Sequence, residues 1–113
     1  MTGTDHHAVV SLSVLATELL EEARAHHSRR TARTIVSGTS MRATVIALAE
    51  GAQLAEHDAP AAATVHVLSG RVRLHTDERE WLLDAGEVVP VPPQRHGLDA
   101  LTDCAVLLTV ALR

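Results

Sequence analysis

From Thr34 onward the chain is a series of short runs of β-branched and aliphatic residues, separated by glycine, proline or charged turns. The runs are TIVS, ATVIALA, TVHVL, RVRLH, EWLL, EVVPV and CAVLLTVAL. Runs of this length and spacing are typical of antiparallel strands in a sandwich or barrel. Within RVRLH, alternation places Val72 and Leu74 on an inner face and the polar residues outside. The sequence therefore predicts an all-β fold over residues 34–113.

A helical pattern precedes these runs, in the segment SLSVLATELLEEARAHH. Its leucines recur at helical spacing, and its glutamates occupy the opposite face. Ser11 or Ser13 can accept a backbone N–H at its first turn. A helix with one apolar face is expected to pack on the outside of a sheet. Residues 1–33 are thus expected to form an N-terminal extension and helix, and the whole chain to form one domain.

Composition narrows the functions that the chain can have. The chain has 113 residues, of which 46% are hydrophobic, but Phe and Tyr are absent and Trp81 is the one tryptophan. An aliphatic interior follows, and little aromatic surface is left for stacking on a base or a sugar. The formal net charge of −4 argues against a nucleic-acid partner.

The single cysteine and the N-terminus indicate a compartment. Cys104 has no second cysteine with which to form an intramolecular disulfide. No apolar run is long enough to span a bilayer, and the N-terminus lacks the order of charges and apolar residues found in a signal peptide. We therefore expect a cytoplasmic protein without a membrane partner.

Two glycine-to-histidine blocks lie within the β region. The first is GAQLAEHDAPAAATVHVLSG, from Gly51 to Gly70, and the second is GEVVPVPPQRHGL, which begins at Gly86. Together they resemble the two cupin motifs, commonly written G-(x)5-H-x-H-(x)3,4-E-(x)6-G and G-(x)5-P-x-G-(x)2-H-(x)3-N. The first block keeps Gly51, His57 and a closing VLSG, and the second keeps Gly86 and Pro92 at the motif spacing.

This resemblance implies a small single-domain cupin, an RmlC-like double-stranded β-helix that forms an antiparallel barrel or jelly roll. In cupins two histidines, a glutamate and a third histidine meet at one inner point and bind a divalent metal. By position these ligands fall on His57, Ala59, Ala63 and His96. Two ligands remain, so the first motif is degenerate. The second block is one residue short, because Gln94 takes the place of its glycine.

A zinc, nickel or iron ion needs about three protein ligands, each at roughly 2.0–2.3 Å. The nearest additional imidazole belongs to His66, but its parity is opposite to that of Ala63 on the same run. Strict alternation would point it away from the inner face, and a bulge after Pro60 would reverse that direction. The candidate metal ligands are therefore His57, His96 and His66.

Two further residues are candidates for a pocket. Arg42 shares one face of its run with Thr44, Ile46 and Leu48, so the face that enters the barrel decides whether Arg42 can contact an anionic ligand. Gln53, in the first glycine-to-histidine block, is the second candidate.

Three functions remain open from the sequence. The favoured one is a cupin that binds a small molecule or a divalent metal in its barrel. The second is a metal-dependent enzyme of the dioxygenase or isomerase type, which would use His57, His96 and a displaced third ligand. The third is a structural dimerisation module with a vestigial pocket. Small cupins usually pair, and open sheet edges gain by being covered, so a homodimer is expected.

Overall fold

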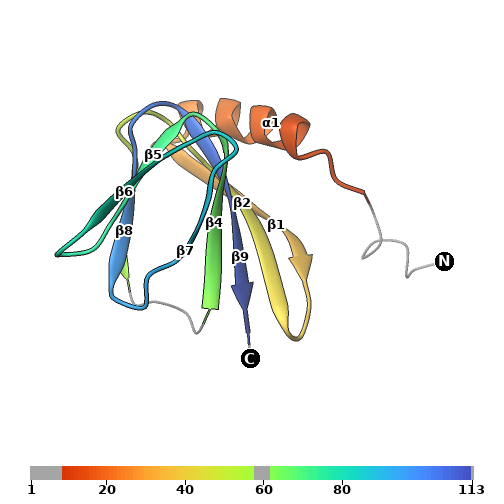
Figure 1. The fold of residues 1–113 in the computed structure, drawn as a ribbon. Helices are drawn as coiled ribbons and strands as arrows, with labels where there is room; N and C mark the ends of the chain where they lie inside the picture. The colour runs from red at the N-terminus through yellow and green to blue at the C-terminus, as the bar shows by residue number, and fades with distance from the viewer. Residues whose placement is uncertain (1–8, 58–61, 113) are drawn as a thin grey trace.

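The computed structural model describes residues 9–57 and 62–112. Within them one helix, α1 (Leu12–Ala25), precedes nine strands (Figure 1). The strands are β1 (Arg30–Ser37), β2 (Met41–Leu48), β3 (Gln53–His57), β4 (Ala62–Ser69), β5 (Arg71–His75), β6 (Glu80–Asp84), β7 (Val88–Pro90), β8 (His96–Ala100) and β9 (Cys104–Ala111). All the strand pairs of the described residues are antiparallel, and the predicted all-β fold with one helix is confirmed.

The strands form two sheets that face each other. The five-stranded sheet has the order β1-β2-β9-β4-β7, and the four-stranded sheet has the order β3-β8-β5-β6 (Figure 1). None of the aliphatic runs in the sequence corresponds to β3 or β8, because the segments QLAEH and HGLDA mix apolar residues with charged residues and glycine. Strand β1 begins at Arg30, so the expected boundary between residues 33 and 34 falls inside it.

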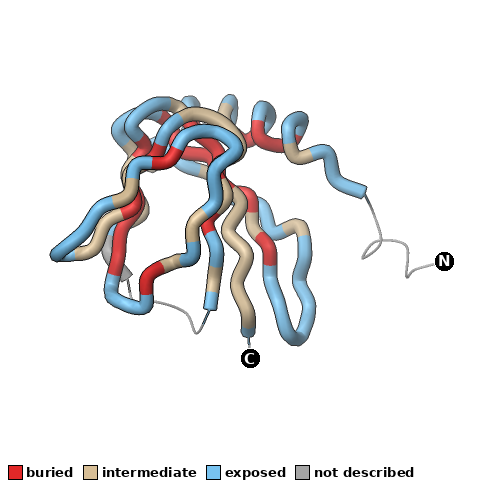
Figure 2. Tube along the Cα trace, viewed as in Figure 1, coloured by how far each residue is buried: buried red, intermediate tan, exposed pale blue. Residues whose placement is uncertain are grey.

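The main core lies between the two sheets and is aliphatic apart from one cysteine. Figure 2 shows buried segments on both sheets. Val72 and Leu74 are buried there, as their alternation predicted. The buried cluster consists of Ile46, Leu48, Val65, Val67, Val72, Leu74, Leu83, Leu98, Ala100, Cys104 and Val106.

Helix α1 covers part of the outer face of the five-stranded sheet, as predicted. A second buried cluster joins them, formed by Leu15, Leu19, Ala23, Val45 and Ala47. Ser11 is the N-cap, and its hydroxyl accepts the backbone N–H of Val14 at 3.4 Å. No helix in the described part of the chain has the length and apolar character needed to cross a membrane.

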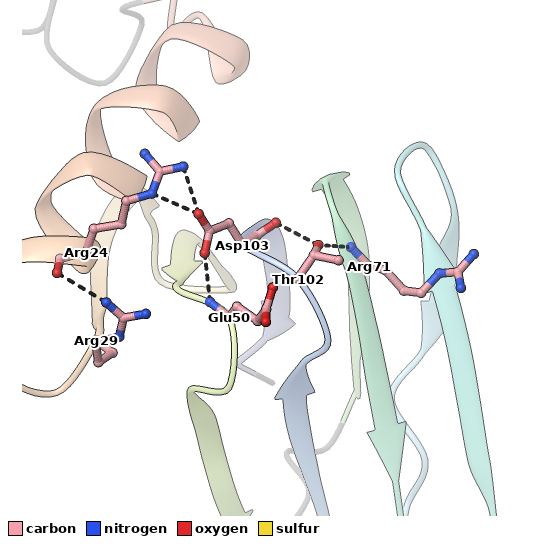
Figure 3. Close-up of polar contacts among 6 residues, drawn as sticks. All are labelled: Arg24, Arg29, Glu50, Arg71, Thr102 and Asp103. Carbon is pink, nitrogen blue, oxygen red and sulfur yellow. Dashed lines mark hydrogen bonds and ion pairs between the residues drawn. The ribbon is translucent and has the colours of Figure 1, made fainter.

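Asp103, in the turn between β8 and β9, ties the helix to a neighbouring turn (Figure 3). Its Oδ1 accepts the backbone N–H of Glu50 at 2.8 Å, and its Oδ2 accepts the Nε–H of Arg24 from α1 at 2.8 Å. The Glu50 hydrogen bond, followed by the Arg24 hydrogen bond, lowers the pKa of the Asp103 carboxyl below its usual value. One carboxylate thus fixes where α1 ends over the sheet.

The turn between β4 and β5 packs against the β8–β9 turn that contains Asp103. Gly70 has a φ of +77°, and a Cβ added there would lie 2.1 Å from the carbonyl oxygen of Asp103. Beside it, the backbone N–H of Arg71 donates to Thr102 Oγ1 at 3.0 Å (Figure 3). Both the backbone conformation and the close approach therefore require glycine at this turn.

We expect Asp103→Ala to lower the free energy of unfolding by about 1–2 kcal/mol at neutral pH, because the Glu50 N–H loses a charged acceptor. Since the folded-state pKa is depressed, this contribution exists above the unfolded-state pKa and is lost as the pH falls through the folded-state pKa. Urea denaturation at pH 7 and at about pH 2 measures both effects. The free energies of unfolding of wild type and Asp103→Ala should be nearly equal at about pH 2.

The matched control is Asp84→Ala, which removes an exposed ion pair with Arg71. Exposed pairs contribute little to stability, so the control should lose clearly less than Asp103→Ala. Equal losses in the two variants would contradict the role assigned to Asp103.

Candidate functional site

His96, in β8, is the one polar side chain that is buried in the described part of the chain, with 4% of its surface exposed. It lines a cavity of about 30 Å³ between the sheets, and the other residues around this cavity are eight aliphatic side chains. A space of this size holds one or two water molecules or a metal ion.

A backbone carbonyl sets the tautomer of the His96 ring. Its Nδ1 lies 3.0 Å from the carbonyl oxygen of Gln94, which can only accept a hydrogen bond. Nδ1 therefore carries the proton, and in the neutral imidazole the lone pair is on Nε2. A histidine held in this way by a backbone carbonyl is in the tautomer that binds metals.

A bulge in β3 decides which residue stands opposite His96. Leu54 pairs with Leu98, and the next described pair is His57 with His96. Between these two pairs β3 advances by three residues, whereas β8 advances by two. Without the extra residue, the partner of His96 would be Glu56. The bulge therefore brings the backbone of His57 to the register position opposite the buried imidazole.

Of the remaining positions of the cupin ligand set, the structure describes the side chain of Ala63 alone. Ala59 and the side chain of His57 lie outside the described residues. Ala63 has the same parity as Val65 and Val67, whose side chains are in the inter-sheet core, so a methyl group stands where the resemblance places glutamate. In the described part of the chain, no three His, Cys, Asp or Glu side chains form a group that could hold an ion.

His66 lies on a different face from the one that a third ligand needs. It stands in β4 between Val65 and Val67, which both point into the inter-sheet core, so alternation directs His66 outward. The bulge that could reverse it was expected after Pro60, which lies outside the described residues. The register shift of β4 occurs after Val67 instead. His66 and His96 are therefore not brought together.

Neither of the two pocket candidates lines the cavity beside His96. Gln53 stands opposite Asp99 on the outer face of the four-stranded sheet, because the neighbouring pair, Leu54 and Leu98, faces inward. Gln53 consequently does not line the cavity. Arg42 shares the inner face of β2 with Ile46, but it is exposed at the strand end. It occupies the open end of the barrel rather than the cavity wall.

Cys104 is fully buried at the start of β9. Burial, followed by the charge of Asp103, raises the pKa of its thiol to about 12. Thiolate, the nucleophilic form, is therefore scarce at neutral pH. Cys104 is a packing residue of the core, as its apolar run predicted.

We expect native Cys104 to react with iodoacetamide at pH 8 about a thousandfold more slowly than the same thiol in urea, because its pKa is raised from 9.0 to about 12. Mass spectrometry of timed samples measures both rates. Similar rates in the native and unfolded protein would show that the thiol is accessible and ionised.

No family model and no curated protein matches this sequence. Solved structures do match it. A conserved protein of unknown function from Streptococcus pyogenes has a TM-score of 0.72 at 22% identity, with 96% of this chain and 90% of that chain covered. A cupin superfamily protein from Desulfitobacterium hafniense has a TM-score of 0.69 at 14% identity, over 74% of this chain and 78% of that chain.

A third structure, KdgF from a Halomonas species, has a TM-score of 0.66 at 18% identity and covers 74% of this chain and 81% of that chain. Similarity at these identities concerns the fold. The chain has the cupin fold, and the prediction from the two glycine-to-histidine blocks is confirmed.

Proposed function

We propose that this protein is a binding module that holds one divalent transition-metal ion between His57 and His96. The observation that supports this function best is the β3 bulge, because it brings the backbone of His57 opposite His96. The Gln94 carbonyl adds to it by leaving the lone pair of the neutral His96 ring on Nε2. A bound ion would supply Lewis acidity and open coordination positions for water or an added ligand.

The donor set and the size of the cavity favour the same kind of ligand. Imidazole nitrogens suit zinc, nickel and iron, whereas calcium and magnesium require oxygen donors. The cavity beside His96 measures about 30 Å³, which suits an ion and its water. Two protein ligands bind an ion less tightly than the usual three, so we expect an exchangeable ion.

Equilibrium dialysis against zinc, followed by mass spectrometry of the metal content, tests this function. We expect about one zinc per chain in the wild type, and at least about tenfold weaker binding in His57→Ala and His96→Ala, because each variant loses one of two ligands. Untagged protein is needed. The adjacent pair His6 and His7 should be replaced by alanine throughout, since neighbouring imidazoles bind metals non-specifically.

His66→Ala is the matched control, because it removes the same ring from the outer face of β4. It should retain the wild-type zinc content. Equal metal content in all four proteins, or a wild type that takes up no zinc, would refute the metal site.

The filled interior also favours a second function, a structural module that pairs with its own copy. Arg33 in β1 is the one charged residue at the outward-facing positions of the described strands of the five-stranded sheet, and it forms an ion pair with Glu22 of α1 at 3.7 Å. The outward-facing positions below α1 are otherwise uncharged. They are Val36, Met41, Ala43, Ala62, Thr64, His66, Val88, Thr109 and Ala111. The outer face of the other sheet instead holds charged pairs, among them Arg71 with Asp84 and Arg73 with Asp99. An uncharged face can meet its twin without burying unpaired charge.

Analytical ultracentrifugation of wild type and Thr109→Glu tests this pairing. Thr109 lies in β9, the central strand of the five-stranded sheet, so a glutamate there would be buried twice in a two-fold interface. We expect a dimeric wild type and a monomeric variant with an unchanged circular dichroism spectrum. Leu82→Glu, on the outer face of the other sheet, should stay dimeric. A monomeric wild type would refute the pairing.

A further inference from the structure

A groove of about 520 Å³ opens on the flank of the barrel, outside the cavity that His96 lines. One side is the turn between β5 and β6, and the other is the chain from β7 toward β8 (Figure 1). Its volume lies within the range of small-molecule sites, roughly 300–1,000 Å³. Its lining includes Thr76, Arg79, Trp81, Val89, Val91 and Pro92.

Both walls of the groove are held in place before any ligand arrives. In the β5–β6 turn, the N–H of Thr76 donates to the Arg79 carbonyl at 2.9 Å, and Thr76 Oγ1 accepts the N–H of Arg79 at 3.1 Å. On the other side, Pro90, Pro92 and Pro93 restrict the backbone. A preformed site loses little conformational entropy when it binds.

The floor of the groove is apolar and carries the one aromatic side chain of the chain. Trp81 is half-buried, and together with Val89 and Val91 it packs on the edge of the inter-sheet core. The partly exposed part of the Trp81 ring, together with Val89 and Val91, offers an apolar surface to the body of a ligand.

Above this floor stands a cation without a carboxylate partner. The guanidinium of Arg79 lies 4.9 Å from the centre of the Trp81 ring. Four other arginines in the described part of the chain form ion pairs with carboxylates, and Arg79 forms none, although Asp77 and Glu78 stand in the same turn. Stacking on the indole restrains the guanidinium, whose planar fork matches a carboxylate.

From these contacts we infer that the groove binds a small organic monocarboxylate, with its carboxylate on Arg79 and its apolar body on Trp81. The groove is lined by two carboxylates, Asp77 and Glu78, and by two cations, Arg79 and Arg95, so it has no excess of positive charge and favours a single carboxylate over a phosphate-rich ligand. Val91 lines both the groove and the small cavity, whereas His96 lines only the cavity. Binding in the groove therefore does not require the metal site.

Trp81 reports binding directly, because the chain has no other tryptophan and no tyrosine or phenylalanine. Titration with cyclohexanecarboxylate, which is transparent where tryptophan absorbs, should change the Trp81 fluorescence saturably. The neutral cyclohexanecarboxamide should bind at least about tenfold more weakly, because it cannot form charge-assisted hydrogen bonds with Arg79.

Two variants locate the carboxylate. Arg79→Gln should weaken the binding of cyclohexanecarboxylate at least about tenfold. The variant should also lose the preference of the wild type for the carboxylate over the carboxamide. Arg42→Gln removes another exposed arginine that is not ion-paired among the described residues, at the start of β2, and should keep the affinity within about twofold. Addition of EDTA should also leave it unchanged, which separates this proposal from the metal site.

The proposal is overturned if the carboxylate produces no saturable change in Trp81 fluorescence and no shift of the indole N–H resonance. It is equally overturned if cyclohexylammonium binds as tightly as the carboxylate, or if Arg79→Gln keeps the wild-type affinity.

Discussion

Alternation of side chains along the strands determines which residues of this protein can meet. One parity of β2, β4, β5 and β9 fills the space between the sheets with aliphatic side chains, and the other parity of β2 meets helix α1. The outer face of the four-stranded sheet receives the charged residues, which pair with one another there. The face on which each candidate site residue lies depends on this alternation, because a shift of one residue moves a side chain to the opposite face.

The β3 bulge shifts the alternation of side chains in this strand, and the proposed function depends on that shift. Without it, Glu56 would be the register partner of His96. With it, His57 takes that position. The cavity beside His96 suits an ion, and the larger groove beside Trp81 suits an organic ligand, so the molecule has two separate spaces of different chemistry.

Much of the fold could be predicted from local patterns. The leucine spacing of α1, its Ser11 cap, the alternation of β5 and the two glycine-to-histidine blocks all carry their information within a few residues. Strands β3 and β8 could not be read in this way, because pairing with their neighbours makes them strands. The one signal of the bulge was that alternation from Leu54 puts Glu56 on a core-facing position. The groove was missed because its walls are separated by ten or more residues and meet only through packing.

Disulfide trapping tests the β3 register, on which the account of the metal site depends. Residues that stand directly opposite in an antiparallel pair have Cα atoms about 4.5–5.5 Å apart, a separation that a disulfide can bridge. The doubly substituted protein His57→Cys with His96→Cys should therefore form a disulfide under mild oxidation, seen by mass spectrometry as the loss of two hydrogens. Glu56→Cys with His96→Cys should not, and native Cys104 is buried and should not interfere. Efficient trapping of the Glu56 pair in place of the His57 pair would show that β3 has no bulge and would contradict the site.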